Sequence, residues 1–173
     1  CTDKTGTLTK NEMTVTRLLV GDAFYEVTGE GYTSAGEIRV TDQHSSPVPR
    51  QSSLPAGLHK LLTAAVLCNG ATLRESQGVW TVISDPTEGA LLVVAAKGGV
   101  TQEEAKRGTS FAGEIPFDAE RKRMTVVRRT EDGLVAYVKG APDVLLSRCA
   151  YRITLDGKPE PLGEPQRKAL LDA

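Results

Sequence analysis

Short runs in which apolar and polar residues alternate recur along the chain and predict β-strands with one buried face. Glycines and turn residues separate these runs, and Glu131, Asp132 and Gly133 predict a tight hairpin between two of them. We expect strands at residues 13–20, 24–28, 37–41, 79–83, 110–117, 123–129, 134–139 and 151–155.

Two longer segments carry apolar residues at helical spacing. The second begins after Asp85, which suits the N-cap, with Pro86 at the first helical position and Glu88 at the capping-box position. It is expected to run to about Lys97, and shorter helices are expected at 101–107, 141–149 and 163–173. The first, residues 58–69, places six residues on one side: Leu58, Leu61, Leu62, Ala65, Val66 and Asn69.

The order of these elements, hairpin-linked strands interrupted by helices, predicts an α/β (α+β) fold. We expect a mostly antiparallel twisted sheet with flanking helices. Residues 42–55 hold three prolines and four serines and are expected to form an exposed loop without a contact role.

Composition excludes several classes of function. The chain has 173 residues, of which 39% are hydrophobic and 25% charged, as in ordinary globular domains. The formal net charge of -1 gives no indication of a nucleic-acid partner, so any bound anion requires a local cluster of cations. The apolar runs 61–68 and 90–96 are too short to cross a bilayer. Three widely spaced cysteines favour a reducing cytosol.

Residues 3–9, Asp-Lys-Thr-Gly-Thr-Leu-Thr, carry the groups needed for phosphoryl transfer. The Asp3 carboxylate can attack phosphorus and become an acyl phosphate, while Lys4 offsets the charge of the transferred group. Gly6 allows backbone to approach a phosphate. A carboxylate here could also share Mg²⁺ with phosphate oxygens. Taken alone, the same residues also fit a polar turn with an Asp cap.

The whole seven-residue string resembles the phosphorylation loop of P-type ATPases. The resemblance implies that Asp3 is the phosphorylated nucleophile, that Lys4 and Thr5 are catalytic, and that Asp3 and Thr5 bind Mg²⁺ in the intact pump. Haloacid-dehalogenase-like phosphatases usually carry a second Asp, an acid/base, where this chain has Thr5. Loss of that group should slow hydrolysis of the acyl phosphate, which favours a pump over a phosphatase.

Residues 85–91, Asp-Pro-Thr-Glu-Gly-Ala-Leu, resemble the segment of the same family that opens a helix in the nucleotide-binding domain. The resemblance implies a hydrogen bond from the adenine amino group to Glu88. On residue pattern alone, a well-formed helix start explains the segment equally well.

Residues 117–124 resemble the family's Phe-x-x-x-Arg-Lys-x-Met segment. The resemblance implies that Phe117 stacks on adenine, that Lys122 lies near the adenine or the phosphates, and that Met124 packs in the same site. A charged loop leading into a strand, with Phe117 in the core, is the alternative.

The same segment departs from the family at one position. Muscle-type calcium pumps carry an arginine where this chain has Ala119, and there it helps to hold phosphate. We expect weaker phosphate contacts here, or a contribution from Arg121 or Arg123.

Residues 139–143, Lys-Gly-Ala-Pro-Asp, resemble a signature of the cation-pump branch, which includes calcium pumps. The resemblance implies that Lys139 lines the site and that Gly140 lets the nucleotide approach backbone. The alternative is an ordinary strand–turn–helix joint. A Ser-Glu-His-Pro string, typical of heavy-metal pumps, is missing from the sequence.

The four segments follow the family's order, and the resemblance covers essentially the whole chain. It implies a phosphorylation-domain stub and hinge at 1–10 and a nucleotide-binding domain at 11–173, truncated at its C-terminal end. We expect a soluble piece at the cytoplasmic face of a membrane-embedded pump, with ATP and Mg²⁺ as cofactors. Its partners would be the remaining phosphorylation, actuator and transmembrane domains, and neither nucleic acid nor the transported cation would bind it.

The intact pump would be an enzyme, whereas this piece is expected to bind ATP without turnover. Two alternatives remain open from the sequence. One is a haloacid-dehalogenase-like phosphatase or phosphotransferase, and the other is a non-catalytic nucleotide-binding module.

Overall fold

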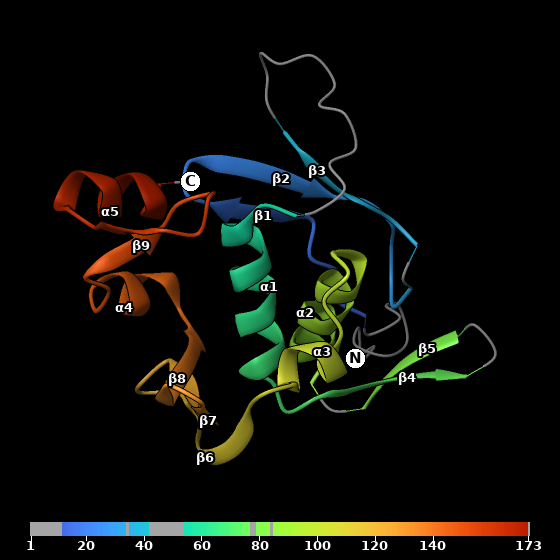
Figure 1. Ribbon diagram of the computed structural model, residues 1–173. Coiled ribbons are helices and arrows are strands. Elements are labelled where there is room, and N and C mark those ends of the chain that lie inside the picture. Colours follow the sequence, from blue (N-terminus) through green and yellow to red (C-terminus); the bar gives the residue numbers. More distant parts are fainter. Residues whose placement is uncertain (1–11, 34, 42–53, 77–78, 84, 173) are drawn as a thin grey trace, which may run out of the picture.

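The computed structural model describes residues 12–33, 35–41, 54–76, 79–83 and 85–172. Two helices, α1 (Ala56–Leu67) and α2 (Pro86–Lys97), pack against each other at the centre, and the strands lie around them (Figure 1). The domain boundary predicted at residues 10 and 11 lies outside the described residues, as does most of the loop predicted at 42–55.

Every strand pairs antiparallel with its neighbours, so the expected α+β class with an antiparallel arrangement is confirmed. Within the described part of the chain the pairing forms four small sheets rather than one. They are β1–β2–β3 (Arg17–Val20, Ala23–Val27, Ile38–Val40), β4–β5 (Thr72–Ser76, Val79–Ile83), β6–β7–β8 (Ser110–Asp118, Arg123–Thr130, Gly133–Gly140) and β9–β10 (Tyr151–Ile153, Pro159–Pro161).

The core lies between α1, α2 and the first sheet. Leu58, Leu62 and Val66 of α1 repeat every four residues and are almost completely buried. They form one cluster with buried residues of the other two elements: Val20, Tyr25, Val27, Leu92, Val94 and Ala95.

The sequence placed Leu61 on the same side of this helix as Leu58 and Leu62, but Leu61 is 38% exposed. The buried stripe is narrower than predicted because it follows the four-residue repeat. Leu61 instead borders a small, largely apolar cavity of about 150 Å³ that Leu19, Ile153 and Leu170 also line.

Helix α2 lies unusually close to strand β5. A Cβ at Gly89 would come within 2.5 Å of Val82 Cγ1, so only glycine allows this approach. Gly89 and Ala90 are both buried, and they follow Glu88 directly in the first turn of the helix. The position of Glu88 is therefore fixed by the packing of its own helix.

The shorter elements lie where the sequence predicted them, with shifted ends. They are α3 (Gln102–Lys106), α4 (Pro142–Leu146) and α5 (Glu164–Leu171). Strands β4 and β10 were not predicted. β4 carries Leu73 as its one large apolar residue, and β10 contains two prolines, so neither shows the alternation that identifies a strand.

Arg152 fastens the C-terminal hairpin to the first sheet. Its guanidinium donates to both carboxylate oxygens of Asp22, at 2.6 and 3.1 Å, and it also donates to Glu160 of the paired strand. The hydrogen bonds from Arg152 lower the pKa of Asp22. None of the helices in the described part of the chain is long and apolar enough to cross a membrane.

Candidate functional site

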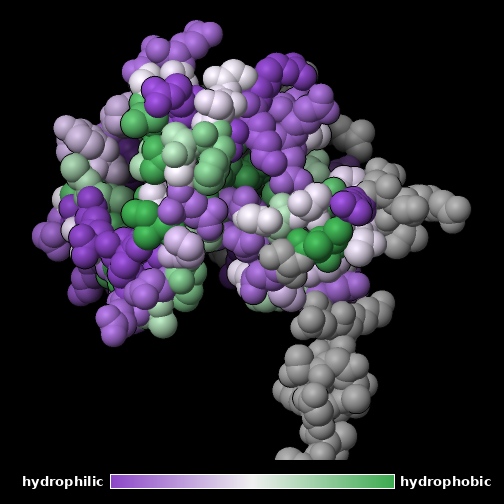
Figure 2. Space-filling model, turned by 90° about the horizontal axis from the view of Figure 1, so that it is seen from below, coloured by the Kyte–Doolittle hydropathy of each residue, from purple (hydrophilic) through white to green (hydrophobic). Residues whose placement is uncertain are grey.

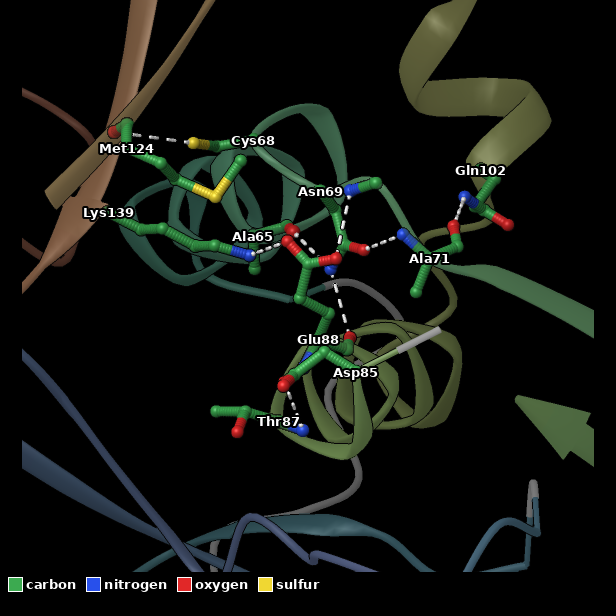
Figure 3. Close-up of polar contacts among 11 residues, drawn as sticks. Ala65, Cys68, Asn69, Ala71, Asp85, Thr87, Glu88, Gln102, Met124 and Lys139 are labelled. Atoms are coloured by element: carbon green, nitrogen blue, oxygen red, sulfur yellow. Dashed lines mark hydrogen bonds and ion pairs between the residues drawn. The ribbon is translucent and has the colours of Figure 1, made fainter. Parts of the chain in front are cut away.

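The three segments that resemble nucleotide-binding motifs come from different elements and converge beside the end of α1 (Figure 3). Glu88 lies in the first turn of α2, Lys139 near the end of β8, and Met124 on β7. We call Asn69, Gly70, Glu88, Met124 and Lys139 the Glu88–Lys139 site. Asp3, Lys4 and Thr5 lie outside the described residues.

The start of α2 is capped as the sequence predicted. Asp85 Oδ1 accepts hydrogen bonds from the backbone N–H groups of Thr87 at 2.8 Å and Glu88 at 3.2 Å. Desolvation alone would raise the pKa of Asp85, but these hydrogen bonds outweigh it and leave the pKa below its usual value.

The Glu88 side chain does not complete a capping box. Oε1 accepts from Lys139 Nζ at 2.6 Å, and Oε2 accepts from the backbone N–H of Gly70 at 3.2 Å. The carboxylate thus turns away from its own helix and joins α2 to β8 and to the segment after α1 (Figure 3).

Glu88 and Lys139 form a half-buried ion pair. Their side chains are 15% and 25% exposed, and 51 residues separate them in the sequence. A pair this far from water loses much of its hydration, so removal of either partner leaves the other charge poorly compensated. The two residues therefore depend on one another for their position.

Asn69 is a member of this site that the functional motifs did not indicate. Its Nδ2 donates to the carbonyl oxygens of Ala65 at 3.3 Å and Glu88 at 2.9 Å, and its Oδ1 accepts from Ala71 N–H at 2.8 Å. The signal in the sequence was an Asn-Gly pair directly after an amphipathic helix, which is typical of a helix end held by side-chain hydrogen bonds.

The apolar side of the site is formed by Met124 and Cys68. Met124 is 6% exposed and packs with Cys68, at the end of α1, and with Val126 and Tyr137 of the third sheet. Burial raises the pKa of the Cys68 thiol, which therefore stays protonated at neutral pH. Its Sγ donates to the Met124 carbonyl oxygen at 3.9 Å.

Phe117 lies on β6 with 63% of its surface exposed. Ile115 pairs with Thr125 and Asp118 with Arg123, so the register shifts by one residue between Ile115 and Asp118, in the stretch that contains Phe117. Bulges of this kind re-aim side chains next to functional sites. The Phe117 side chain is therefore accessible to a planar ligand.

The turn between β6 and β7 holds the basic part of the segment. Lys122 adopts a left-handed conformation with φ 51, and its N–H donates to the Asp118 carbonyl oxygen at 2.7 Å. Arg121 N–H donates to Asp118 Oδ1, also at 2.7 Å. Lys122 Nζ lies 3.8 Å from Asp143, and both side chains are more than half exposed.

Gly140 is required by its own chain. A Cβ there would lie 2.3 Å from the Lys122 carbonyl oxygen, which accepts a hydrogen bond from Ala141 N–H at 3.0 Å. The glycine therefore allows the end of β8 to pass the Lys122 turn, and this close approach accounts for the residue without a ligand.

Positive charge gathers around this turn although the whole chain is almost neutral. The pKa of Arg123 is lowered by desolvation and then by the like charges of Arg148 and Arg121.

Figure 2 views the molecule from the end where the third sheet lies, and polar side chains there separate several apolar groups. The exposed large apolar residues of β6 are Phe111, Ile115 and Phe117.

Comparison with known proteins assigns the family. A family model described as P-type ATPase, cytoplasmic domain N, matches residues 57–173. The chain is 37% identical over 174 residues to a calcium-transporting ATPase of Bacillus subtilis (strain 168), covering 100% of this chain and 19% of that protein. It is 38% identical over 158 residues to the cation-transporting ATPase pma1 of Synechocystis sp., covering 91% and 17%.

The mouse (Mus musculus) calcium-transporting ATPase type 2C member 1 is 38% identical over 154 residues, covering 86% of this chain and 16% of its own length. The chain thus spans less than a fifth of the length of each of these relatives. Since the family model covers well over half of the chain, the chain belongs to the P-type cation-transporting ATPase family, and its residues 57–173 correspond to cytoplasmic domain N.

Proposed function

We propose that this chain binds ATP through the Glu88–Lys139 site, as the nucleotide-binding domain of a cation-transporting P-type ATPase. The observation that supports this most strongly is the contact of Glu88 with Lys139 at 2.6 Å. Two segments that resemble nucleotide motifs thereby meet, although nothing in their spacing requires it. The accessible ring of Phe117 and the buried Met124 supply apolar surface for a base.

Adenine recognition follows from the chemistry of these groups. A carboxylate has about four acceptor positions, and Glu88 uses two of them for Lys139 and Gly70. A further position is open to the 6-amino group of adenine, which donates hydrogen bonds. Guanine presents an oxygen there, which the carboxylate would repel. Phe117 stacks on the ring and adds affinity without reading the base.

The phosphates are held by the basic turn. Arg121 and Lys122 extend from the segment that follows Phe117, and Arg123 adds to the positive potential. An anion bound by a nearly neutral protein needs such a local cluster. With Ala119 in place of an arginine, Arg121 and Lys122 carry this role.

The phosphoryl transfer is proposed to take place at Asp3. Its carboxylate oxygen forms a bond to the γ-phosphorus while the bond from that phosphorus to the β–γ bridging oxygen breaks, and ADP leaves. Lys4 offsets the negative charge. Thr5 provides no acid/base, so the acyl phosphate persists. Asp3 and Thr5 offer oxygen atoms, the donor type that Mg²⁺ takes, and Mg²⁺ would further neutralise the phosphates.

In the intact protein the acyl phosphate drives cation transport, with the actuator, transmembrane and remaining phosphorylation domains as partners, and this domain faces the cytoplasm. The relatives' names, calcium-transporting and cation-transporting ATPase, support this proposal. The chain by itself is proposed to bind ATP without turnover.

Replacement of Lys139 by alanine tests the proposal. We expect the dissociation constant for ATP, measured by calorimetric titration of the 173-residue chain, to rise by about tenfold or more. The reason is the loss of a charged hydrogen-bond partner, worth roughly 1.5–3 kcal/mol. Lys60→Ala is the matched control, because Lys60 Nζ also makes a single short contact, to the Gly157 carbonyl oxygen at 2.8 Å. Equal ATP affinity in both variants would contradict the proposal.

A further inference from the structure

We infer that Asn69 is a positioning residue that holds the Glu88 carboxylate in place to receive a 6-amino purine. The inference rests on the proposed ATP-binding function and deepens it. It assigns base selectivity to a side chain that touches neither the proposed base nor the phosphates. Asn69 instead contacts the backbone of Ala65, Ala71 and Glu88.

The Asn69 side chain ties three elements together. It donates to Ala65 near the end of α1 and to the Glu88 carbonyl in the first turn of α2, and it accepts from Ala71 just before β4. Cys68 and Ala71, which flank the Asn69–Gly70 pair, are 1% and 3% exposed, so the pair is held between two buried residues while Gly70 itself is exposed. Asn69 thereby sets the separation between the segment after α1 and the start of α2.

That separation determines the contact between Gly70 and Glu88. The Gly70 N–H, which is adjacent to Asn69 in the chain, donates to Glu88 Oε2 at 3.2 Å, while Lys139 holds Oε1 (Figure 3). A backbone donor is fixed, whereas the four-carbon stem of a lysine is flexible. The orientation of the carboxylate therefore depends on Gly70, and that of Gly70 on Asn69.

Gln102 of α3 offers a matched control, because it also contacts the segment that follows α1. Its Nε2 donates to the Ala71 carbonyl oxygen at 3.1 Å, and its Oε1 accepts from Leu73 N–H at 3.4 Å. It thus supports the start of β4 from the other side. These contacts to Ala71 and Leu73 stabilise the start of β4 and do not involve Glu88. Gln102→Ala should cost stability but keep the carboxylate in position.

The experiment compares two nucleotides that differ only at the recognised group. ATP carries the 6-amino group, and purine riboside triphosphate carries hydrogen in its place. We expect the wild-type chain to bind ATP about tenfold more tightly, because one hydrogen bond to a charged group is at stake. Asn69→Ala should weaken ATP binding about tenfold, leave purine riboside triphosphate unchanged and so abolish the preference. Gln102→Ala should retain it.

Asn69→Asp provides a second variant in case the alanine variant does not fold. It keeps the acceptor for Ala71 N–H but loses the donor to the Glu88 carbonyl oxygen, so the preference for ATP should again disappear. Thermal unfolding of each variant, followed by circular dichroism, reports stability separately from selectivity.

Other outcomes would overturn the inference. An Asn69→Ala or Asn69→Asp chain that folds and keeps the wild-type preference would show that Asn69 does not position Glu88. Equal weakening of both nucleotides, in step with a lower melting temperature, would show a purely structural role. If the wild-type chain binds neither nucleotide, the proposed function itself fails, and the inference fails with it for that separate reason.

Discussion

Phe117→Ala is expected to raise the dissociation constant for ATP by about 5- to 150-fold. Stacking of a base on an aromatic ring contributes roughly 1–3 kcal/mol, which corresponds to this range. Phe117 is 63% exposed in the stretch where the register of β6 and β7 shifts, so the substitution should remove surface for the proposed base and little of the protein's own packing. Calorimetric titration with ATP would measure the change, and the melting temperature should stay nearly constant.

Phe111→Ala is the control for this prediction. Phe111 lies on the same strand and is 60% exposed, but it pairs with Arg128, away from the Glu88–Lys139 site. Its removal should leave ATP affinity unchanged. If the two variants bind ATP equally well, Phe117 does not contact the base and the assignment of the site is wrong.

Leu62→Ala should lower the free energy of unfolding by about 3 kcal/mol. Leu62 is 1% exposed in the cluster shared by α1, α2 and the first sheet, and truncation of such a leucine costs roughly 2–5 kcal/mol. A Cβ at Gly98 would lie 2.4 Å from Leu62 Cδ1, which shows how completely this side chain fills the space at the end of α2. Denaturant unfolding followed by circular dichroism would measure the loss.

Leu61→Ala tests whether the narrow buried stripe is correct. Leu61 is the preceding residue of the same helix but is 38% exposed, so the loss should stay below about 1 kcal/mol. A larger loss from Leu61→Ala than from Leu62→Ala would mean that α1 presents a different face to the core.

Much of the fold could be predicted because local signals agreed with packing. Helix α2 has an N-cap at Asp85, proline at its first position and Gly98 at its end, and the structure places the helix at Pro86–Lys97. On β7 burial alternates as a strand requires, with Met124, Val126 and Arg128 buried, although Arg128 is charged. Strand β4 escaped prediction because its pairing with β5, rather than its own composition, makes it a strand.

The candidate site was predicted only in part. The resemblance named Glu88, Met124 and Lys139, and the structure brings these three together. Their roles toward a nucleotide stay predictions, as do those of Phe117 and Lys122. The sequence favoured a capping box for Glu88. Local spacing cannot show that Gly70 and Lys139, which are distant in the sequence, bind the two oxygens of its carboxylate instead.

The sequence placed Asn69 on the same side of its helix as Leu58 and Leu62, without a functional role. Its three hydrogen bonds connect residues from 65 to 88, so its role depends on the tertiary arrangement of α1 and α2. Gly140 was assigned to the approach of the nucleotide, whereas its lack of a Cβ is already required by the Lys122 carbonyl oxygen. A close contact between two segments of the chain, such as the one at Gly140, produces no pattern that can be recognised in the sequence.

The most direct test of the account is an NMR titration of the 15N-labelled chain with ATP, followed through the backbone amides. We expect the largest shift changes at Gly70, Glu88, Phe117, Lys122 and Lys139, with saturation in the millimolar range or below. Shift changes centred on another part of the chain, such as α5 and the β9–β10 hairpin, or no change at high millimolar ATP, would contradict the proposal that these residues form an ATP site.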